Sequence, residues 1–307
     1  MSTHYPNIRV FSEGGFSLLR DGLSFNFYIR CPHQEVARQV LSTLDVYLDA
    51  LAPQALGLYA DENGDAQLLD ATGWIQIRRE LLEEECPIVR LFSGSSQEEQ
   101  YGFEYYGQML TNPFNEDNLD PVCAMEFRLP TRYLEEHGPD RVRELVLQLA
   151  APLPLCFGQA GLCFEGSLDL IGVLRLIRAR CFRYPGMDIS NPGHLRDYIG
   201  SYVRGPSWLT FLGQPVLGQL GGATGLRSRL HHPGTTVQEL EGGRAVVTLG
   251  EWPEAGDLEQ GQTLPAYREL ARILEPWLYH DKRPGSPYDD FTPEDRYRWE
   301  RRFLDGP

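Results

Sequence analysis

The residues best suited to chemistry in this chain are two adjacent histidines and two carboxylate pairs. Two imidazoles on a turn could contact a metal or a phosphate, and paired carboxylates could transfer protons or hold a divalent cation. Neighbouring side chains on a strand or helix point in different directions, so adjacency does not make a shared site. The candidates are His231 and His232, with the pairs Glu116-Asp117 and Asp289-Asp290. They support one hypothesis, a hydrolase with an unrecognised carboxylate or histidine site.

Motifs with a defined catalytic spacing do not strengthen that hypothesis. The chain has no H-E-x-x-H, no C-x-x-C and no G-x-S-x-G. Residues 218–225 are rich in glycine but lack the P-loop spacing and its lysine. The six cysteines are scattered among apolar neighbours, which is typical of buried reduced thiols. We therefore expect no catalytic residue, no metal site and no cofactor.

Charge is the strongest unassigned feature of the chain. The formal net charge is −15, and residues 1–150 hold 24 acidic residues against 11 arginines. Between Glu80 and Asp120 there are ten acids, opposed only by Arg90. Such a field repels phosphate backbones and attracts a basic protein, although a solvated surface is the simpler explanation. We expect no direct binding of nucleic acid, and the candidate contacts for a basic partner are Glu83, Glu84, Glu85, Glu98, Glu99, Glu116, Asp117 and Asp120.

The elements that must position these acids are a helix and two loops. Periodicity predicts a helix over residues 74–85 that ends in three glutamates, an arrangement that opposes the helix dipole. Loops at 93–97 and 111–120 separate strands expected at 88–92, 101–110 and 122–129. Both loops lie within the acidic stretch. They are candidate contact surfaces.

The rest of the chain predicts an α+β fold with a mixed, largely antiparallel sheet and flanking helices. Alternating apolar residues indicate a strand at 23–29 before a helix at 36–51. A second strand-helix unit falls at 122–164, so two related halves, 1–150 and 151–279, are a hypothesis within one compact domain, 1–279. A polar linker and a charged helix follow at 280–307. The other predicted elements are a core helix at 168–181, a hairpin at 237–249 and a helix at 265–274.

Membrane and export signals are weak. The most apolar run, residues 168–176, is interrupted by Asp169 and Arg175 and falls short of the ~20 residues that span a bilayer. The N-terminus has neither a basic nor an apolar signal region. We expect a cytoplasmic protein without a membrane segment.

An ordered set of short motifs in the second half carries a family resemblance. The run Trp208-Leu-Thr-Phe-Leu-Gly213 is followed by Leu220-Gly-Gly222, Gly256-Asp257 and Leu264-Pro-Ala-Tyr267. Over residues 15–280 the chain resembles the type VI secretion immunity family of TsiT-like proteins. Large aromatic residues and turn glycines usually maintain a fold. We therefore expect a structural role for the signature residues Trp208, Phe211, Gly213, Gly221, Gly222 and Tyr267.

This resemblance implies a cytoplasmic antitoxin that binds and neutralises a secreted effector, with no turnover of its own. It further implies that the effector is a TseT-type nuclease toxin. A nuclease presents a basic cleft, which the acidic stretch could occlude. Two alternatives remain: the hydrolase described above, and an effector-binding adaptor that uses the same acidic surface. The sequence leaves the oligomeric state open.

Overall fold

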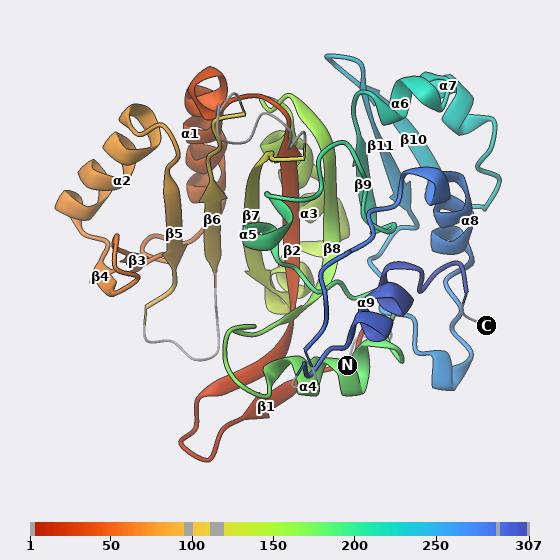
Figure 1. Ribbon diagram of the computed structural model, residues 1–307, viewed down its shortest axis with the longest axis horizontal. Coiled ribbons are helices and arrows are strands. Elements are labelled where there is room, and N and C mark those ends of the chain that lie inside the picture. The colour runs from red at the N-terminus through yellow and green to blue at the C-terminus, as the bar shows by residue number, and fades with distance from the viewer. Residues whose placement is uncertain (1–3, 95–100, 111–119, 287–288, 306–307) are drawn as a thin grey trace.

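The computed structural model describes residues 4–94, 101–110, 120–286 and 289–305. These residues form an 11-stranded sheet in which every pair of named strands is antiparallel. The sheet runs from β4 at one end to β10 at the other (Figure 1), and β1 (Arg9–Phe11) pairs with β2 outside this order. The order is β10 (Thr235–Leu240), β11 (Arg244–Leu249), β9 (Leu209–Leu212), β8 (Leu155–Glu165), β2 (Ser17–Ile29), β7 (Cys123–Pro130), β6 (Gly102–Tyr106), β5 (Ile88–Phe92), β3 (Leu58–Ala60) and β4 (Ala66–Leu68).

The central strand β2 is buried on both of its faces, because other elements cover this part of the sheet on both sides. Phe27 belongs to one apolar cluster and its neighbour Tyr28 to the other, as strand alternation requires. Helices α1 (His33–Ala50), α2 (Ala71–Glu83) and α3 (Thr131–Ala150) pack into the first cluster. The remaining helices are α4 (Val173–Cys181), α5 (Pro192–Leu195), α6 (Val216–Gln219), α7 (Gly222–Arg227), α8 (Pro265–Leu274) and α9 (Pro293–Glu300), with 3₁₀ turns at Leu258–Gln260 and Glu275–Trp277. The expected α+β class with a largely antiparallel sheet is confirmed.

A row of polar residues crosses the second face of the sheet. Cross-strand partners join β9, β8, β2, β7, β6 and β5 through one residue on each strand. The row is Thr210, Gln159, Asn26, Glu126, Glu104 and Arg90. Its first four members are buried. Buried polar groups need partners, so this row constrains how the second face can be covered.

Two predicted helices differ from their expected form. Helix α4 is shorter than 168–181, and it lies on the surface, with Ile171 just before it fully exposed. The expectation of a deep core helix was wrong because arginines such as Arg175 and Arg178 leave only one face apolar. Helix α3, which falls in the predicted strand-helix unit at 122–164, is not one regular helix, because it kinks at Gly138, whose φ is 76°.

The C-terminal segment packs onto the main body of the protein. Trp299 and Phe303 are 4% and 2% exposed. Thr292 and Asp295 form the reciprocal capping box at the start of α9, and Arg178 of α4 lies 2.7 Å from Asp295. The boundary at 279/280 stays a prediction. So do the two halves, which share one sheet because β2 pairs with β8.

The large signature residues are buried, and the signature glycines occupy positions that a larger residue would strain. Trp208, Phe211 and Tyr267 are 1%, 1% and 2% exposed. A Cβ on Gly213 would stand 1.9 Å from the carbonyl oxygen of Leu155. Gly221 and Gly222 form the start of α7, with φ values of 84° and 71° that favour glycine. Within the described part of the chain, every helix is too short or too polar to cross a membrane.

Candidate functional site

Helix α2 presents the predicted glutamates to solvent. Its N-terminus is fixed by Asp70, whose carboxylate accepts the N–H groups of Thr72 and Gly73, each at 2.9 Å. One face of the helix packs inward through Ile77 and Leu81. The helix ends at Glu83, and the side chains of residues 83–85 are all exposed. The predicted run of three carboxylates therefore stands at a free helix end.

The turn between β3 and β4 brings a second acidic group to the same region. Asp61 accepts the backbone N–H groups of Asn63 and Asp65 at 3.0 Å and the Gln67 amide at 2.8 Å. The hydrogen bonds, led by that from Gln67, lower the pKa of Asp61 below its usual range. Asp61 is thus held ionised, beside Glu62, by the turn itself.

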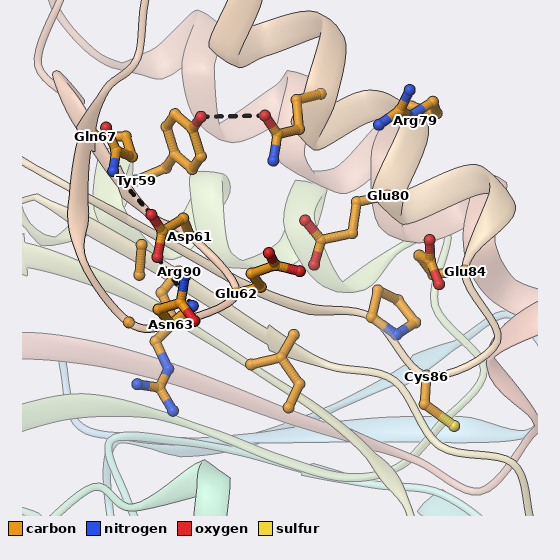
Figure 2. Close-up of a pocket in the computed structure, with 15 residues that line it drawn as sticks. Tyr59, Asp61, Glu62, Asn63, Gln67, Arg79, Glu80, Glu84, Cys86 and Arg90 are labelled. Carbon is orange, nitrogen blue, oxygen red and sulfur yellow. Dashed lines mark hydrogen bonds between the residues drawn. The ribbon is translucent and has the colours of Figure 1, made fainter.

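A cavity of about 810 Å³ lies between this turn, helix α2 and strand β5. Four carboxylates line it, together with two guanidinium groups. In Figure 2 the side chain of Glu80 extends from the helix into the cavity, towards the turn that carries Asp61 and Glu62. We call this the acidic cavity, and its charged lining residues are Asp61, Glu62, Glu80, Glu84, Arg79 and Arg90.

The carboxylates of the acidic cavity repel one another. Burial raises the pKa of Glu80, and the nearby charge of Glu84 adds to this, while the N–H of Ile88 opposes it. Arg90 lines the cavity but also contacts Tyr106, because its guanidinium lies 5.7 Å from the centre of the Tyr106 ring. A cation placed in the cavity would relieve this repulsion. The arrangement is suited to binding a basic group and has no nucleophile paired with a base.

The other predicted contact residues do not join this cavity in the described structure. Asp120 lies against Gly200, whose N–H its backbone oxygen accepts at 2.8 Å, and it lines a separate cavity with Tyr198 and Tyr202. Glu98, Glu99, Glu116 and Asp117 fall outside the described residues. The structure therefore brings together Glu84 and its neighbours 83 and 85, but leaves the second group unplaced.

One acid of the 80–120 stretch serves the interior instead of the surface. Glu104 pairs with Arg128 of β7 and accepts a hydrogen bond from Tyr106. Burial opposes ionisation of Glu104, but the charge of Arg128 outweighs it and lowers the pKa. Its charge is compensated from outside the stretch, which sequence spacing could not reveal.

The described residues among those considered for hydrolysis take part in structural hydrogen bonds, the histidines through their backbone. The backbone N–H groups of His231 and His232 both donate to Glu269 of α8, at 2.9 and 3.0 Å. Asp290 accepts from Arg175. Among the described residues, no group of three or more His, Cys, Asp or Glu side chains could hold a metal ion.

Two features of the acidic cavity were missed at the level of sequence. Asp61 and Glu62 were not among the predicted contact residues, and their position near α2 depends on the β3–β5 pairing, which joins residues 32 and 34 positions apart. Cys86, expected to be buried, is exposed at the cavity rim. A run of acids in a turn, Asp61-Glu-Asn-Gly-Asp65, was the only available signal.

Comparison with known proteins gives the family directly. The model of a protein family described as "TsiV: Type VI immunity for VRR-NUC" matches residues 39–303. The match includes the C-terminal segment, which the resemblance over 15–280 left out. A solved structure described as Pseudomonas aeruginosa T6SS protein PA0821 is similar over 98% of this chain and 88% of its own, with a TM-score of 0.77 and 20% sequence identity. A search of curated proteins found no match.

The structural similarity, at 20% identity, supports the fold, and the family match supplies the function. The match spans most of the chain, and its description names both the secretion system and a nuclease-type toxin. A member of such a family acts by binding its toxin and not by turnover. The chain therefore belongs to the TsiV family and is a type VI secretion immunity protein directed against a VRR-NUC nuclease toxin.

Proposed function

We propose that this protein neutralises its cognate toxin by placing the acidic cavity and the exposed glutamates 83–85 against the toxin's nucleic-acid-binding cleft. The observation that carries the proposal is the continuity of the two features. Glu84 belongs to both, because it follows the end of α2 and lines the cavity. Together they present six carboxylates from two elements far apart in sequence. Inhibition would be occlusion of the cleft, without chemistry.

The physical basis is the charge that any nuclease must provide for its substrate. A cleft that holds a phosphate backbone is lined by Lys and Arg, so it attracts an acidic protein surface. Charges at the rim of an interface mainly accelerate association, whereas charges enclosed by it contribute more to the lifetime of the complex. Glu83 and Glu85 are exposed and suit the first role, and the partly buried Glu80 suits the second.

The remaining parts of the proposal follow from the same field. The protein would act in the cytoplasm, where a nuclease toxin meets nucleic acid, and would itself bind no nucleic acid because its carboxylates repel phosphates. We keep the single domain, 1–279, with the C-terminal segment 280–307 as its appendage. Glu98, Glu99, Glu116, Asp117 and Asp120 are a second contact group in this proposal, on the basis of charge alone.

The experiment is charge reversal of the helix end. The variant Glu83→Arg, Glu84→Arg, Glu85→Arg should bind the toxin's nuclease domain at least ~10-fold more weakly, because the new arginines then face the basic residues of the toxin cleft. Affinity is measured by calorimetry, and protection by growth of cells that express the toxin. A second variant reverses Glu98, Glu99, Glu116 and Asp117.

The matched control carries the same change in net charge at the other end of the sheet. Glu239, Glu241 and Glu251 are exposed and lie on or beside β10 and β11, so their reversal to Arg leaves the acidic cavity intact. This control should bind the toxin with an affinity close to that of the wild type. Equal affinity in all the variants would contradict the proposal, and equal weakening in the control would reduce it to an effect of net charge.

A further inference from the structure

The two faces of the sheet are covered to different extents. On the first face, β3, β5 and β6 contribute Tyr59, Val89, Leu91, Phe103 and Tyr105 to the first apolar cluster. On the second face, the second cluster contains side chains of β2, β7, β8, β9 and β11, and among the described residues it contains none from β3, β4, β5 or β6. The core on the second face therefore ends before the β4 end of the sheet.

Helix α5 marks where the cover of the second face ends. It packs against Tyr106 of β6, because a Cβ on Gly193 would stand 3.0 Å from Tyr106 Cζ, and the Arg196 guanidinium lies 5.1 Å from the centre of the ring. Tyr106 is 6% exposed, whereas its cross-strand partner Ile88 on β5 is 43% exposed. Figure 1 shows α5 in front of β7, while the described helices leave β5 and β6 open towards the viewer. The cover stops between β6 and β5.

The bare part of this face carries apolar side chains. Leu68, Leu58 and Phe92 are cross-strand neighbours on β4, β3 and β5, and all three lie outside both apolar clusters. Leu68 is 73% exposed, and the other two are half-buried. We call Leu58, Leu68, Ile88 and Phe92 the apolar strip. An antiparallel sheet that faces water on one side normally places polar residues there, so this strip indicates a surface that another molecule covers.

The apolar strip is continuous with the acidic cavity. Ile88 belongs to both, and Arg90, its neighbour on the same face of β5, also lines the cavity. The charges on the sheet itself oppose one another, because Glu104 pairs with Arg128 and is also near Arg90. The excess of carboxylates thus lies at one border of the strip, in the cavity and at the end of α2. An apolar centre with a charged border is typical of a protein interface.

We propose that the apolar strip is the centre of the toxin interface, and that the acidic cavity and the glutamates 83–85 form its charged border. The inference rests on the proposed function, because it takes the toxin as the occupant. It adds a property of the partner: the toxin presents an apolar patch beside its basic cleft. Occlusion by charge alone would not require such a patch.

Charge favours the toxin over a second copy of this chain as the occupant. Two copies that met through this face would bring two acidic cavities together, in a chain whose formal net charge is −15. A basic toxin would instead compensate the carboxylates at the border while the strip loses its contact with water. The border charges would then govern association, and the apolar centre would govern the lifetime of the complex.

The test measures binding of the full-length cognate toxin to the variant Leu68→Gln, Ile88→Gln. This double substitution keeps every charge, so the complex should be at least ~10-fold weaker through faster dissociation, with an association rate close to that of the wild type. The matched control is Ile171→Gln, at a 102% exposed position before α4, which should bind as the wild type does. Surface plasmon resonance measures both rates.

Salt and folding are checked on the same proteins. Raising the ionic strength should weaken the wild type and the double variant by the same factor, because their charges are identical. Leu68→Gln alone changes a 73% exposed side chain and should leave the urea midpoint of unfolding unchanged. Weaker binding by this single variant therefore cannot come from unfolding.

The outcomes separate this inference from the proposed function. It is overturned if the double variant binds as the wild type does while reversal of the glutamates 83–85 weakens binding, and the proposed function then stands without the apolar centre. If only the double variant binds more weakly, docking on the strip is supported and the role of the carboxylates fails. Sedimentation of the free protein tests the other occupant: a dimer that the double substitution dissociates would overturn the inference, because a second copy would then cover the strip.

Discussion

The β4 end of the sheet displays its charges, whereas the β10 end uses a charge to hold the fold together. Around α2 and the β3–β4 turn, carboxylates face a cavity or solvent. At the other end, Arg244 of β11 is 9% exposed and donates to the carbonyl oxygens of Ala150, Ala151 and Leu153. These carbonyls lie at or just after the C-terminus of α3, where a helix leaves acceptors without partners. The Arg244 guanidinium thus caps a helix from a distant strand.

This contrast teaches that formal charge is a poor guide to a binding surface until its partners are known. Residues 1–150 carry most of the net charge, yet Glu104 in that region is neutralised by Arg128 and Asp21 by Arg9. The acidic cavity differs because its carboxylates outnumber the guanidinium groups beside them. We expect substitutions at the β10 end to change stability, and substitutions at the β4 end to change association.

The largest effect should come from Gly213→Ala, next to the β9 strand. The added Cβ would meet the Leu155 carbonyl at 1.9 Å, and a backbone atom cannot move aside as a side chain can. We expect a loss of about 3 kcal/mol or more in the free energy of unfolding, measured by urea denaturation. Gly94→Ala, near the β4 end, is the control, since no atom lies within 4 Å of its added Cβ. Equal stability of the two variants would break the comparison.

A smaller effect should follow Arg244→Gln. The substitution removes the guanidinium donors at the end of α3 and leaves the Ala151 carbonyl oxygen without its side-chain donor, at a cost of about 1–3 kcal/mol in unfolding free energy. Arg79→Gln, an exposed arginine of the acidic cavity, should change stability by less than ~0.5 kcal/mol. Chemical denaturation of both variants checks this, and a larger cost at Arg79 would reverse the roles assigned to the two ends.

Between the two ends, Glu126 should make stability depend on pH. Burial raises its pKa to about 7, partly opposed by Arg128. The folded state then binds a proton that the unfolded state releases, so the free energy of unfolding falls as the pH rises from about 4.5 towards 7, by up to ~1.4 kcal/mol per pH unit. Glu126→Gln should flatten this dependence. Denaturation at pH 5, 6 and 7 measures it, and an unchanged slope in the variant would assign the effect to other groups.

The smallest expected effect concerns the rate of association at the acidic cavity. Arg79→Gln removes a cation from the acidic cavity, so association with a basic toxin should become a few-fold faster at low salt. Stopped-flow mixing at low and high ionic strength measures the association rate, with the reversal of Glu239, Glu241 and Glu251 as the control. A slower association of Arg79→Gln would mean that the arginine itself contacts the toxin.

Much of the fold could be predicted from local pattern. The strand at 88–92, the helix at 265–274 and the hairpin turning at Gly242-Gly243 match the structure at their boundaries or nearly so, because strong periodicity and turn glycines act over a few residues. The prediction of a core helix at 168–181 was wrong, because the arginines of α4 leave only one of its faces apolar. Its apolar residues looked like a core helix, but only Val173, Ile177 and Cys181 find the interior.

The candidate site was predictable only in part. The glutamates 83–85 were identified by their position at a helix end, which is a local property. Asp61 and Glu62 were not, because the β3–β5 pairing that brings their turn beside α2 joins segments about thirty residues apart. The burial of Glu104 depends on Arg128, its diagonal neighbour across β6 and β7, and on no feature of its own surroundings in sequence.

The sequence by itself determined the element types, the acidic character of the first half and, through the motifs around Trp208, the family. Those properties depend on side-chain chemistry and on contacts a few residues apart. The tertiary structure decided which charges are displayed and which are used internally. Sheet pairing placed Asp61 and Glu80 around one cavity and paired Glu104 with Arg128, because the distance between charges in space, and not along the chain, sets their energy.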